Sequence, residues 1–132
     1  MLEINIPNEI FEQMLEQAGA EAPIEACGIL AGRGRTVERI YRMTNIEARE
    51  DHYMMEPAEQ LAAVKDMRAA GLNMLAIYHS HPATAARPSA EDIRLAFTPD
   101  ITYVIRACCV EFKFSIYNAI HMTYSIASER EL

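Results

Sequence analysis

The chain has 132 residues, of which 51% are hydrophobic, and its formal net charge is −7. This length fits one domain of residues 1–132, and the hydrophobic content excludes a disordered chain. The acidic balance argues against a nucleic-acid-binding protein, because such proteins usually carry a basic patch.

The three cysteines are Cys27, Cys108 and Cys109. An odd count, with two adjacent residues and no C-x-x-C pair, predicts reduced thiols rather than a disulfide framework or a cysteine-rich zinc site. The first five residues lack the basic start and apolar run of a signal peptide, and no apolar run approaches the length of a membrane span. We therefore expect a cytoplasmic protein.

The first elements are predicted from apolar periodicity. Helical spacing predicts a helix over residues 8–19, with Asn8 as its cap and Gly19 at its end. Residues 27–31 form a short apolar run, which is typical of a buried strand, and residues 36–43 read as the returning strand.

Residues 44–55 are polar and mixed, which predicts a loop or a short edge strand. A second helix should begin at Pro57 and run to about Ala70, because Pro is favoured at the first helical position and Gly71 stands just past the end. The continuous apolar run 74–78 predicts a central strand that is covered on both faces.

The C-terminal part begins with a predicted loop over residues 83–88 and a helix from Ser89 to Pro99. Strands are expected at residues 101–107, 110–117 and 120–126, followed by a frayed tail at 127–132. Helices that alternate with strands early, with strands alone later, predict an α/β fold in which helices flank one mixed sheet.

His79 and His81 stand at the C-terminal end of the predicted central strand. Residues i and i+2 of a strand point to the same face, so both imidazoles can reach one ion at the usual zinc–nitrogen distance of about 2.0–2.1 Å. Two histidines at a strand end are nevertheless often plain surface groups, and this pair alone is weak evidence.

Ser89 and Asp92 form a Ser-x-x-Asp pattern after a short loop. Taken alone, the pattern favours a helix capping box. The cap and a metal site are compatible, because a carboxylate one turn into the helix could be a third ligand. Two histidines and one carboxylate would leave a position open for water, which is the catalytic pattern of zinc sites.

Glu25 is the best candidate for the proton acceptor that such a site requires, because it stands at the entrance of an apolar strand. An isolated glutamate before a strand is more commonly solvated, and that alternative stays open at this point.

Two separated motifs resemble one family. The segment His79-Ser80-His81-Pro82, six residues, then Ser89-Ala90-Glu91-Asp92 matches the signature H-[ST]-H-P-x6-S-x2-D of the JAMM (MPN+) metallopeptidases. Glu25-Ala26-Cys27-Gly28 is similar to the family's E-x-C-G segment. Asn45, the start of the helix at Met55-Glu56-Pro57 and the approach to His79 also look like the small prokaryotic members.

The resemblance implies a three-layer α/β/α sandwich with a mixed sheet, related to the cytidine deaminase fold. It implies that His79, His81 and Asp92 bind zinc (Zn2+). It further implies that Glu25 acts on the water and that Ser89 stabilises the oxyanion at the scissile carbonyl. The expected activity is hydrolysis of a peptide or isopeptide bond after the C-terminal glycine of a ubiquitin-like, ThiS/MoaD-like sulfur carrier protein, for example with release of cysteine.

Two other functions stay possible: a non-catalytic MPN scaffold that binds proteins, and a zinc hydrolase of small molecules. The scaffold class typically lacks one or more metal ligands, whereas this chain has all three. Among the remaining candidates, Cys27 is expected to pack in the core, and His52 and His121 are expected to be solvated.

Overall fold

The computed structural model describes residues 4–82, 89, 92, 101–107, 113–118 and 123–128. Its elements alternate between helix and strand early and are strands alone at the end, as predicted. They are α1 (Asn8–Glu21), β1 (Cys27–Arg33), β2 (Thr36–Met43), α2 (Pro57–Ala70), β3 (Asn73–His81), β4 (Thr102–Ala107), β5 (Lys113–Asn118) and β6 (Thr123–Ser128).

The strands form one six-stranded sheet in the order β2-β1-β3-β4-β5-β6. β3 and β4 are parallel, and the other neighbouring strands are antiparallel, so the sheet is mixed as expected. β3 lies in the interior of the sheet, between β1 and β4, and it carries both motif histidines.

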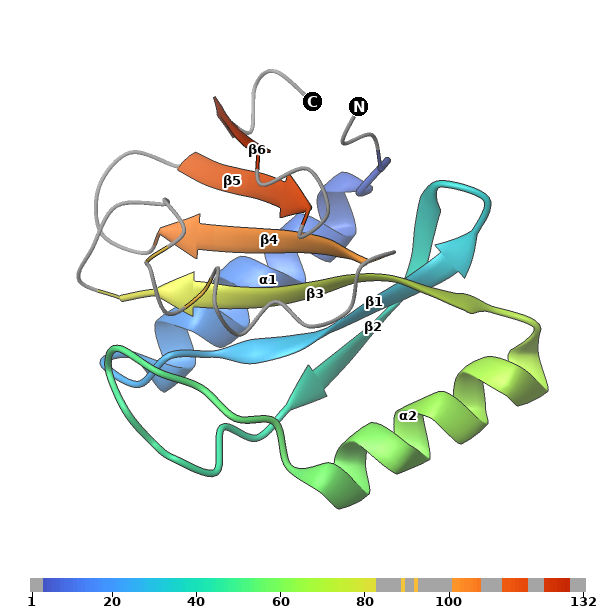
Figure 1. Cartoon of the computed structure of the whole chain (residues 1–132), viewed down its shortest axis with the longest axis horizontal. Coiled ribbons are helices and arrows are strands. Elements are labelled where there is room, and N and C mark those ends of the chain that lie inside the picture. The colour runs from blue at the N-terminus through green and yellow to red at the C-terminus, as the bar shows by residue number, and fades with distance from the viewer. Residues whose placement is uncertain are drawn as a thin grey trace.

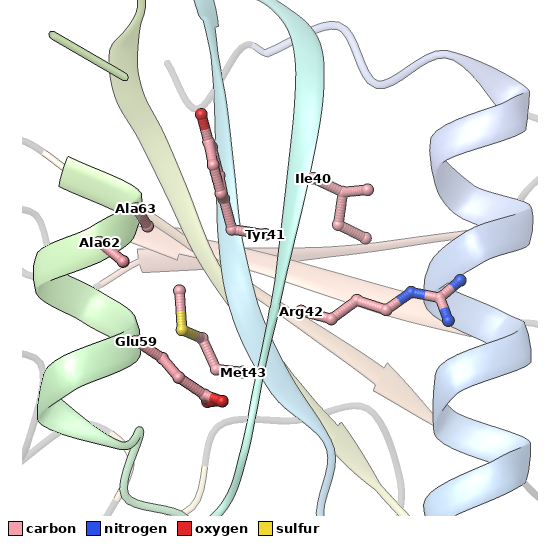
Figure 2. Close-up of a pocket in the computed structure, with 7 residues that line it drawn as sticks. All are labelled: Ile40, Tyr41, Arg42, Met43, Glu59, Ala62 and Ala63. Carbon is pink, nitrogen blue, oxygen red and sulfur yellow. The ribbon is translucent and has the colours of Figure 1, made fainter. Parts of the chain in front are cut away.

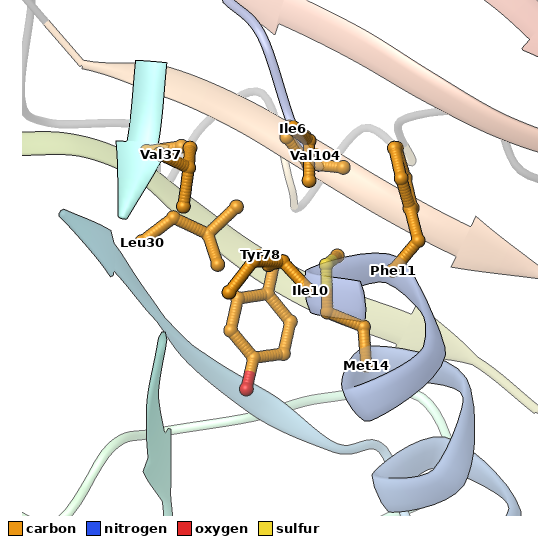
Figure 3. Close-up of a cluster of buried hydrophobic side chains, with 9 residues drawn as sticks. Ile6, Ile10, Phe11, Met14, Leu30, Val37, Tyr78 and Val104 are labelled. Carbon is orange, nitrogen blue, oxygen red and sulfur yellow. The ribbon is translucent and has the colours of Figure 1, made fainter. Parts of the chain in front are cut away.

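α1 covers one face of the sheet, and α2 lies on the other (Figure 1). Figure 3 shows the core beneath α1, where side chains of the helix pack against β1, β3 and β4. On the opposite face, Cys27 and Ile29 of β1 pack with Ala63 and Met67 of α2. The expected three-layer α/β/α arrangement is therefore confirmed.

The boundaries of α1 differ from the prediction. Pro7, not Asn8, occupies the N-cap position, and no side chain caps this end. The helix also continues past Gly19 to Glu21. A single glycine weakens a helix without ending it, whereas Pro23 holds Ala22 in an extended conformation, with ψ at 140°, and thereby stops the helix.

The boundaries of α2 match the prediction because its local signals are strong. Glu56 accepts a hydrogen bond from the backbone N–H of Glu59 at 2.8 Å, Pro57 stands at the first position, and Gly71 ends the helix in the left-handed region at φ 69°. Among the described residues, no helix is long and apolar enough to cross a membrane.

Several strands extend past their predicted ends: β1 runs to Arg33 rather than residue 31, and β5 runs to Asn118 rather than residue 117. β3 extends from Asn73 through His81, so both histidines lie inside the strand, beyond the end of the predicted apolar run at residue 78. β6 includes residues 127 and 128, which were expected to belong to a frayed tail. The predicted loop at 83–88, most of the predicted helix from Ser89 to Pro99, His121 and residues 129–132 lie outside the described residues.

Candidate metal centre

The pairing of β1 with β3 brings the two motifs together. Cys27 is the antiparallel partner of His79, and the backbone N–H of Ser80 donates to the carbonyl of Ala26 at 2.9 Å. Glu25 precedes Cys27 by two residues and therefore lies on the same face of the sheet, beside the end of β3 that carries His81. This is the face that α2 covers.

His79, His81 and Asp92 form a compact triangle. The Nε2 atoms of the two histidines are 3.2 Å apart. Asp92 reaches both rings, with Oδ1 at 3.2 Å from His79 Nε2 and Oδ2 at 3.0 Å from His81 Nε2. The Glu25 carboxylate completes a cluster in which one ligand atom from each of the four residues lies within 4.8 Å of all the others.

The triangle has the dimensions of a zinc site. Ligand atoms about 2.0–2.1 Å from a tetrahedral ion stand roughly 3.3 Å from one another. The two Nε2 atoms are 3.2 Å apart, and each lies 3.0–3.2 Å from one of the two Asp92 oxygens, which is close to this value. Two imidazole nitrogens and one carboxylate also form a donor set that zinc accepts, so these residues fit the metal.

Burial sets the protonation of His79, whose side chain is fully buried. Burial lowers the pKa of the ring, against an opposing effect of the nearby Asp92, so the imidazole is held neutral and keeps a lone pair for a metal. Burial alone would raise the pKa of Asp92, but the hydrogen bonds to His79 and His81 outweigh it and hold that pKa below its usual range.

Ser89 and Asp92 do form the reciprocal contacts of a capping box. The Ser89 Oγ accepts from the Asp92 N–H at 3.0 Å, and the Asp92 Oδ2 accepts from the Ser89 N–H at 2.8 Å. The same carboxylate faces the two imidazoles. One side chain therefore makes the cap and also lies in the cluster, which the sequence allowed.

Glu25 is not a solvated glutamate. Its residue is 2% exposed, and its Oε1 lies 3.6 Å from the Nε2 of His79. A buried carboxylate is costly unless other groups compensate its charge, and a cation in the cluster would do so.

Three further residues support the centre. Tyr53 stacks on the His79 ring, with centroids 4.7 Å apart and an interplanar angle of 24°. Asn45 donates to the Glu25 carbonyl at 3.0 Å. Ser80, between the two histidines, accepts from the Ala26 N–H at 2.8 Å. Sequence patterns point to Asn45 and Ser80 only as parts of family motifs, and they give no signal for Tyr53.

Gly28 of the E-x-C-G segment has a steric role. A Cβ atom there would lie 2.3 Å from the hydroxyl of Tyr78, whose buried ring crosses β1 at this point. Tyr78 in turn donates a hydrogen bond to the Oε1 of Gln17 on α1. Only glycine leaves room for this packing.

The exposure of Cys27 and His52 tests two further expectations from the sequence. Cys27 is fully buried, and burial raises the pKa of its thiol to about 12, so it stays protonated and packs as an apolar group. His52 was expected to be solvated, which is wrong: its side chain is 14% exposed and its Nε2 lies 3.1 Å from the Glu47 carboxylate.

A groove of about 450 Å3 lies between β2 and α2 (Figure 2). None of the four clustered residues lines it, so it is separate from the candidate metal centre. Its lining residues are Ile40, Tyr41, Arg42, Met43, Glu59, Ala62 and Ala63.

Known proteins with similar sequences carry peptidase names. The "CysO-cysteine peptidase" of Mycobacterium tuberculosis is 39% identical over 99 residues, which cover 74% of this chain and 68% of that protein. The "Probable TtuB-protein conjugate cleaving protease" of Thermus thermophilus is 38% identical over 96 residues, 72% of this chain and 64% of the other.

A solution structure of a protein from Desulfitobacterium hafniense is also similar. It is 41% identical, with a TM-score of 0.81 and coverage of 96% of this chain and 90% of that one. The family model described as prokaryotic homologs of the JAB domain matches residues 7–119. This chain therefore belongs to the prokaryotic homologs of the JAB domain, and it is a peptidase of the JAMM type.

Proposed function

We propose that this peptidase is zinc-dependent and hydrolyses the amide bond after the C-terminal glycine of a ubiquitin-like sulfur carrier protein. The observation that carries the proposal is the buried cluster of Glu25, His79, His81 and Asp92. A scaffold domain would have no need for four ionisable groups within 4.8 Å of one another beneath the surface, because their burial is costly.

His79, His81 and Asp92 would hold the zinc ion. Three protein ligands leave a fourth position open, as catalytic zinc sites require. Zinc, when bound, supplies Lewis acidity that lowers the pKa of a water ligand to about 7 and polarises a carbonyl oxygen.

Glu25 would act as the general base and then as the general acid. Its carboxylate lies 3.6 Å from the Nε2 of His79, which places it within the cluster but farther from that nitrogen than Asp92 is. There it would take the proton of the attacking water and return it to the leaving amine. Cys27, protonated and fully buried, takes no part as a nucleophile.

Ser89 would stabilise the oxyanion. Its Oγ accepts from the Asp92 N–H, and this contact uses an oxygen lone pair while leaving the hydroxyl hydrogen available. Ser89 is exposed beside the buried carboxylate, so that hydrogen can reach a substrate carbonyl. One donor of this kind contributes about 2.7–4 kcal/mol to the transition state.

The names of the relatives support the substrate class. One relative is named for an adduct of a protein called CysO with cysteine, and another is named for conjugates of a protein called TtuB. Only nine residues separate Asp92 from the start of β4, which leaves little room for the long insertions of enzymes that cut ubiquitin chains. A compact carrier tail with a small leaving amine suits such a site.

The test measures zinc content and cleavage of a ThiS/MoaD-like carrier protein that bears a C-terminal cysteine adduct. We expect one zinc per chain, loss of cleavage with a chelator and recovery with added zinc. If the purified protein binds no zinc at micromolar levels, the scaffold function is correct instead. Zinc binding without release of cysteine would refute the proposed substrate and leave the metal site standing.

A further inference from the structure

The segment between β2 and α2 is closed at its neck and lies against the candidate metal centre. The Glu56 N–H donates to the Thr44 carbonyl at 3.1 Å, and the Ile46 N–H donates to the Met54 carbonyl at 2.9 Å. Residues 44–56 thus form a closed loop, which we call the clasp. No residue of the clasp belongs to the four-residue cluster or lines the groove between β2 and α2.

Asn45 occupies the inside of the clasp and is 9% exposed. Its Oδ1 accepts from the N–H groups of Glu47 at 3.2 Å and Met54 at 3.1 Å. Its Nδ2 donates to the carbonyls of His52 at 2.9 Å and Glu25 at 3.0 Å. Two donors and two acceptors are the full capacity of an amide side chain, so Asn45 is completely satisfied.

The hydrogen bond from Asn45 to the backbone carbonyl of Glu25 connects the clasp to the residue that carries the proposed general base. The other polar backbone group of Glu25 is also held there, because its N–H donates to the Arg49 carbonyl at 2.8 Å. The clasp therefore holds Glu25 on both sides of its Cα. A buried side chain on such a backbone has little freedom to move.

The same amide holds the clasp against a metal ligand. Asn45 bonds to the residues on both sides of Tyr53, and the Tyr53 ring stacks on His79 at 4.7 Å. The Nδ1 atom of His79 has no hydrogen-bond partner among the described residues. Among these residues, the Tyr53 ring packs on the His79 ring, whereas a metal-binding histidine usually also has a hydrogen bond at its far nitrogen.

We propose that Asn45 is a positioning residue that fixes Glu25 and, through Tyr53, the His79 ring in one mutual geometry. This role rests on the proposed function, since it assigns Asn45 to the placement of the general base relative to the metal. A misplacement of about 1 Å can cost roughly 100-fold in rate, which sets the size of the expected effect.

The decisive variant is Asn45→Asp, which keeps the shape and both acceptor bonds but replaces the Nδ2 donors with an oxygen that faces two carbonyls. With the carrier–cysteine adduct as substrate, we expect kcat to fall about 10- to 100-fold while KM stays within about threefold. Zinc content measured with zinc in excess should stay at the wild-type value, because His79, His81 and Asp92 are all present, and saturation offsets a loss of affinity.

The second measurement needs neither metal nor substrate. In the metal-free protein, the stacked Tyr53 ring shields the ring protons of His79, and NMR should show them shifted upfield. In Asn45→Asp, these signals should move downfield, and the Glu25 N–H should exchange with solvent faster. If the wild-type protein fails to cleave the adduct, the substrate proposal fails, whereas the NMR arm still decides whether Asn45 holds the two groups.

The matched control is Gln17→Glu, the same change in another buried amide. Gln17 donates to the Cys27 carbonyl at 3.0 Å and accepts from Tyr78, on the face opposite the metal cluster. It should lower the Tm while leaving kcat and the His79 shifts unchanged. Equal losses of kcat in both variants at equal Tm would overturn the proposal, as would wild-type kcat and shifts in Asn45→Asp. If Asn45→Asp does not fold, the same measurements are made on Asn45→Ser, which removes the amide without adding a charge.

Discussion

Cys27 on β1 is the direct antiparallel partner of His79 on β3. Paired residues on neighbouring strands point to the same face. Glu25 lies two residues before Cys27 and His81 two residues after His79, so both share that face. The Cys27 thiol is fully buried, and the position of Cys27 in the ladder brings the carboxylate of one motif to the imidazoles of the other.

Glu25→Gln should keep the metal and lose activity. The amide has the same shape as the carboxylate but cannot accept the proton of the attacking water, so kcat should fall about 10²- to 10⁴-fold. Zinc content by atomic emission and initial rates on the carrier–cysteine adduct measure the two effects. The exposed Glu12→Gln on α1 is the control and should match the wild type. Full activity of Glu25→Gln would exclude the proposed base.

Asp92→Asn should lose the metal. The charge of Asp92 faces two buried imidazoles at 3.0 and 3.2 Å, and changes to groups that only support a metal ligand already cost 10- to 100-fold in affinity. We therefore expect zinc affinity to fall at least about 100-fold, measured by competition with a chromogenic chelator. Asp66→Asn, at an exposed ion pair with Arg39, should leave zinc affinity unchanged. Wild-type affinity in Asp92→Asn would remove Asp92 from the ligand set.

Ser89→Ala should lower kcat about 10²- to 10³-fold, because it removes the hydroxyl proposed to stabilise the oxyanion. It also removes the acceptor of the Asp92 N–H, a capping contact for which about 0.5–2 kcal/mol of stability is expected. Ser89→Thr keeps both functions and should retain most of the activity. Steady-state kinetics and thermal unfolding separate the two losses. An unchanged kcat in Ser89→Ala would leave the hydroxyl with the capping function alone.

Gly28→Ala should destabilise the fold. The new Cβ would lie 2.3 Å from the Tyr78 hydroxyl and 2.4 Å from its ring, and overpacking of this kind costs about 1–3 kcal/mol. The control is Gly19→Ala in α1, where a Cβ meets nothing within 4 Å and helix propensity predicts a gain of about 0.5–1 kcal/mol. Urea unfolding gives both values. Tyr78→Leu should make Gly28→Ala less costly in a double-mutant cycle, and additivity of the two changes would contradict the steric explanation.

The metal-free protein should lose stability as the pH falls below about 6.5, the ordinary pKa of histidine. Burial lowers the pKa of His79 in the folded state, so the unfolded chain takes up a proton there that the folded protein does not. The stability is present above pH 6.5 and declines below it, by at most about 1.4 kcal/mol per pH unit for this one group. The lowered pKa of Asp92 acts in the same direction only at more acidic pH, near and below the ordinary aspartate value.

Urea unfolding of the chelator-treated protein between pH 7.5 and 5.5 measures this loss. His79→Gln removes the titrating ring and should give a flatter profile over the same range. Equal slopes for the two proteins would show that His79 does not cause the pH dependence.

Local signals predicted much of the fold. The bounds of α2 follow from Pro57 and Gly71, and β2 has the predicted bounds of residues 36–43. The end of α1 was missed because a glycine at an exposed helical position is tolerated. The C-terminal part of β3 was missed because His79 and His81 are polar, and polar residues are buried in a strand only where other groups compensate them.

Tyr53 shows where sequence patterns stop being informative. It lies in a polar segment without periodicity, and its contact with His79 joins residues 26 positions apart in the chain. Burial and, next, the charge of Asp92 raise the pKa of its phenol, so the ring stays neutral beside the imidazole. Asn45 was recognised only as part of a family pattern, since its four hydrogen bonds depend on how the clasp closes.

The sequence by itself determined the local relations: the i, i+2 spacing that aims His79 and His81 to one side, the capping box of Ser89 and Asp92, and the motifs that resemble the family. These follow from backbone periodicity, which acts over a few residues. Only the tertiary structure decided that Glu25 is buried and meets His79, 54 positions away in the chain. That contact depends on the register between β1 and β3, and a strand's pattern specifies which face is buried but not which strand lies beside it.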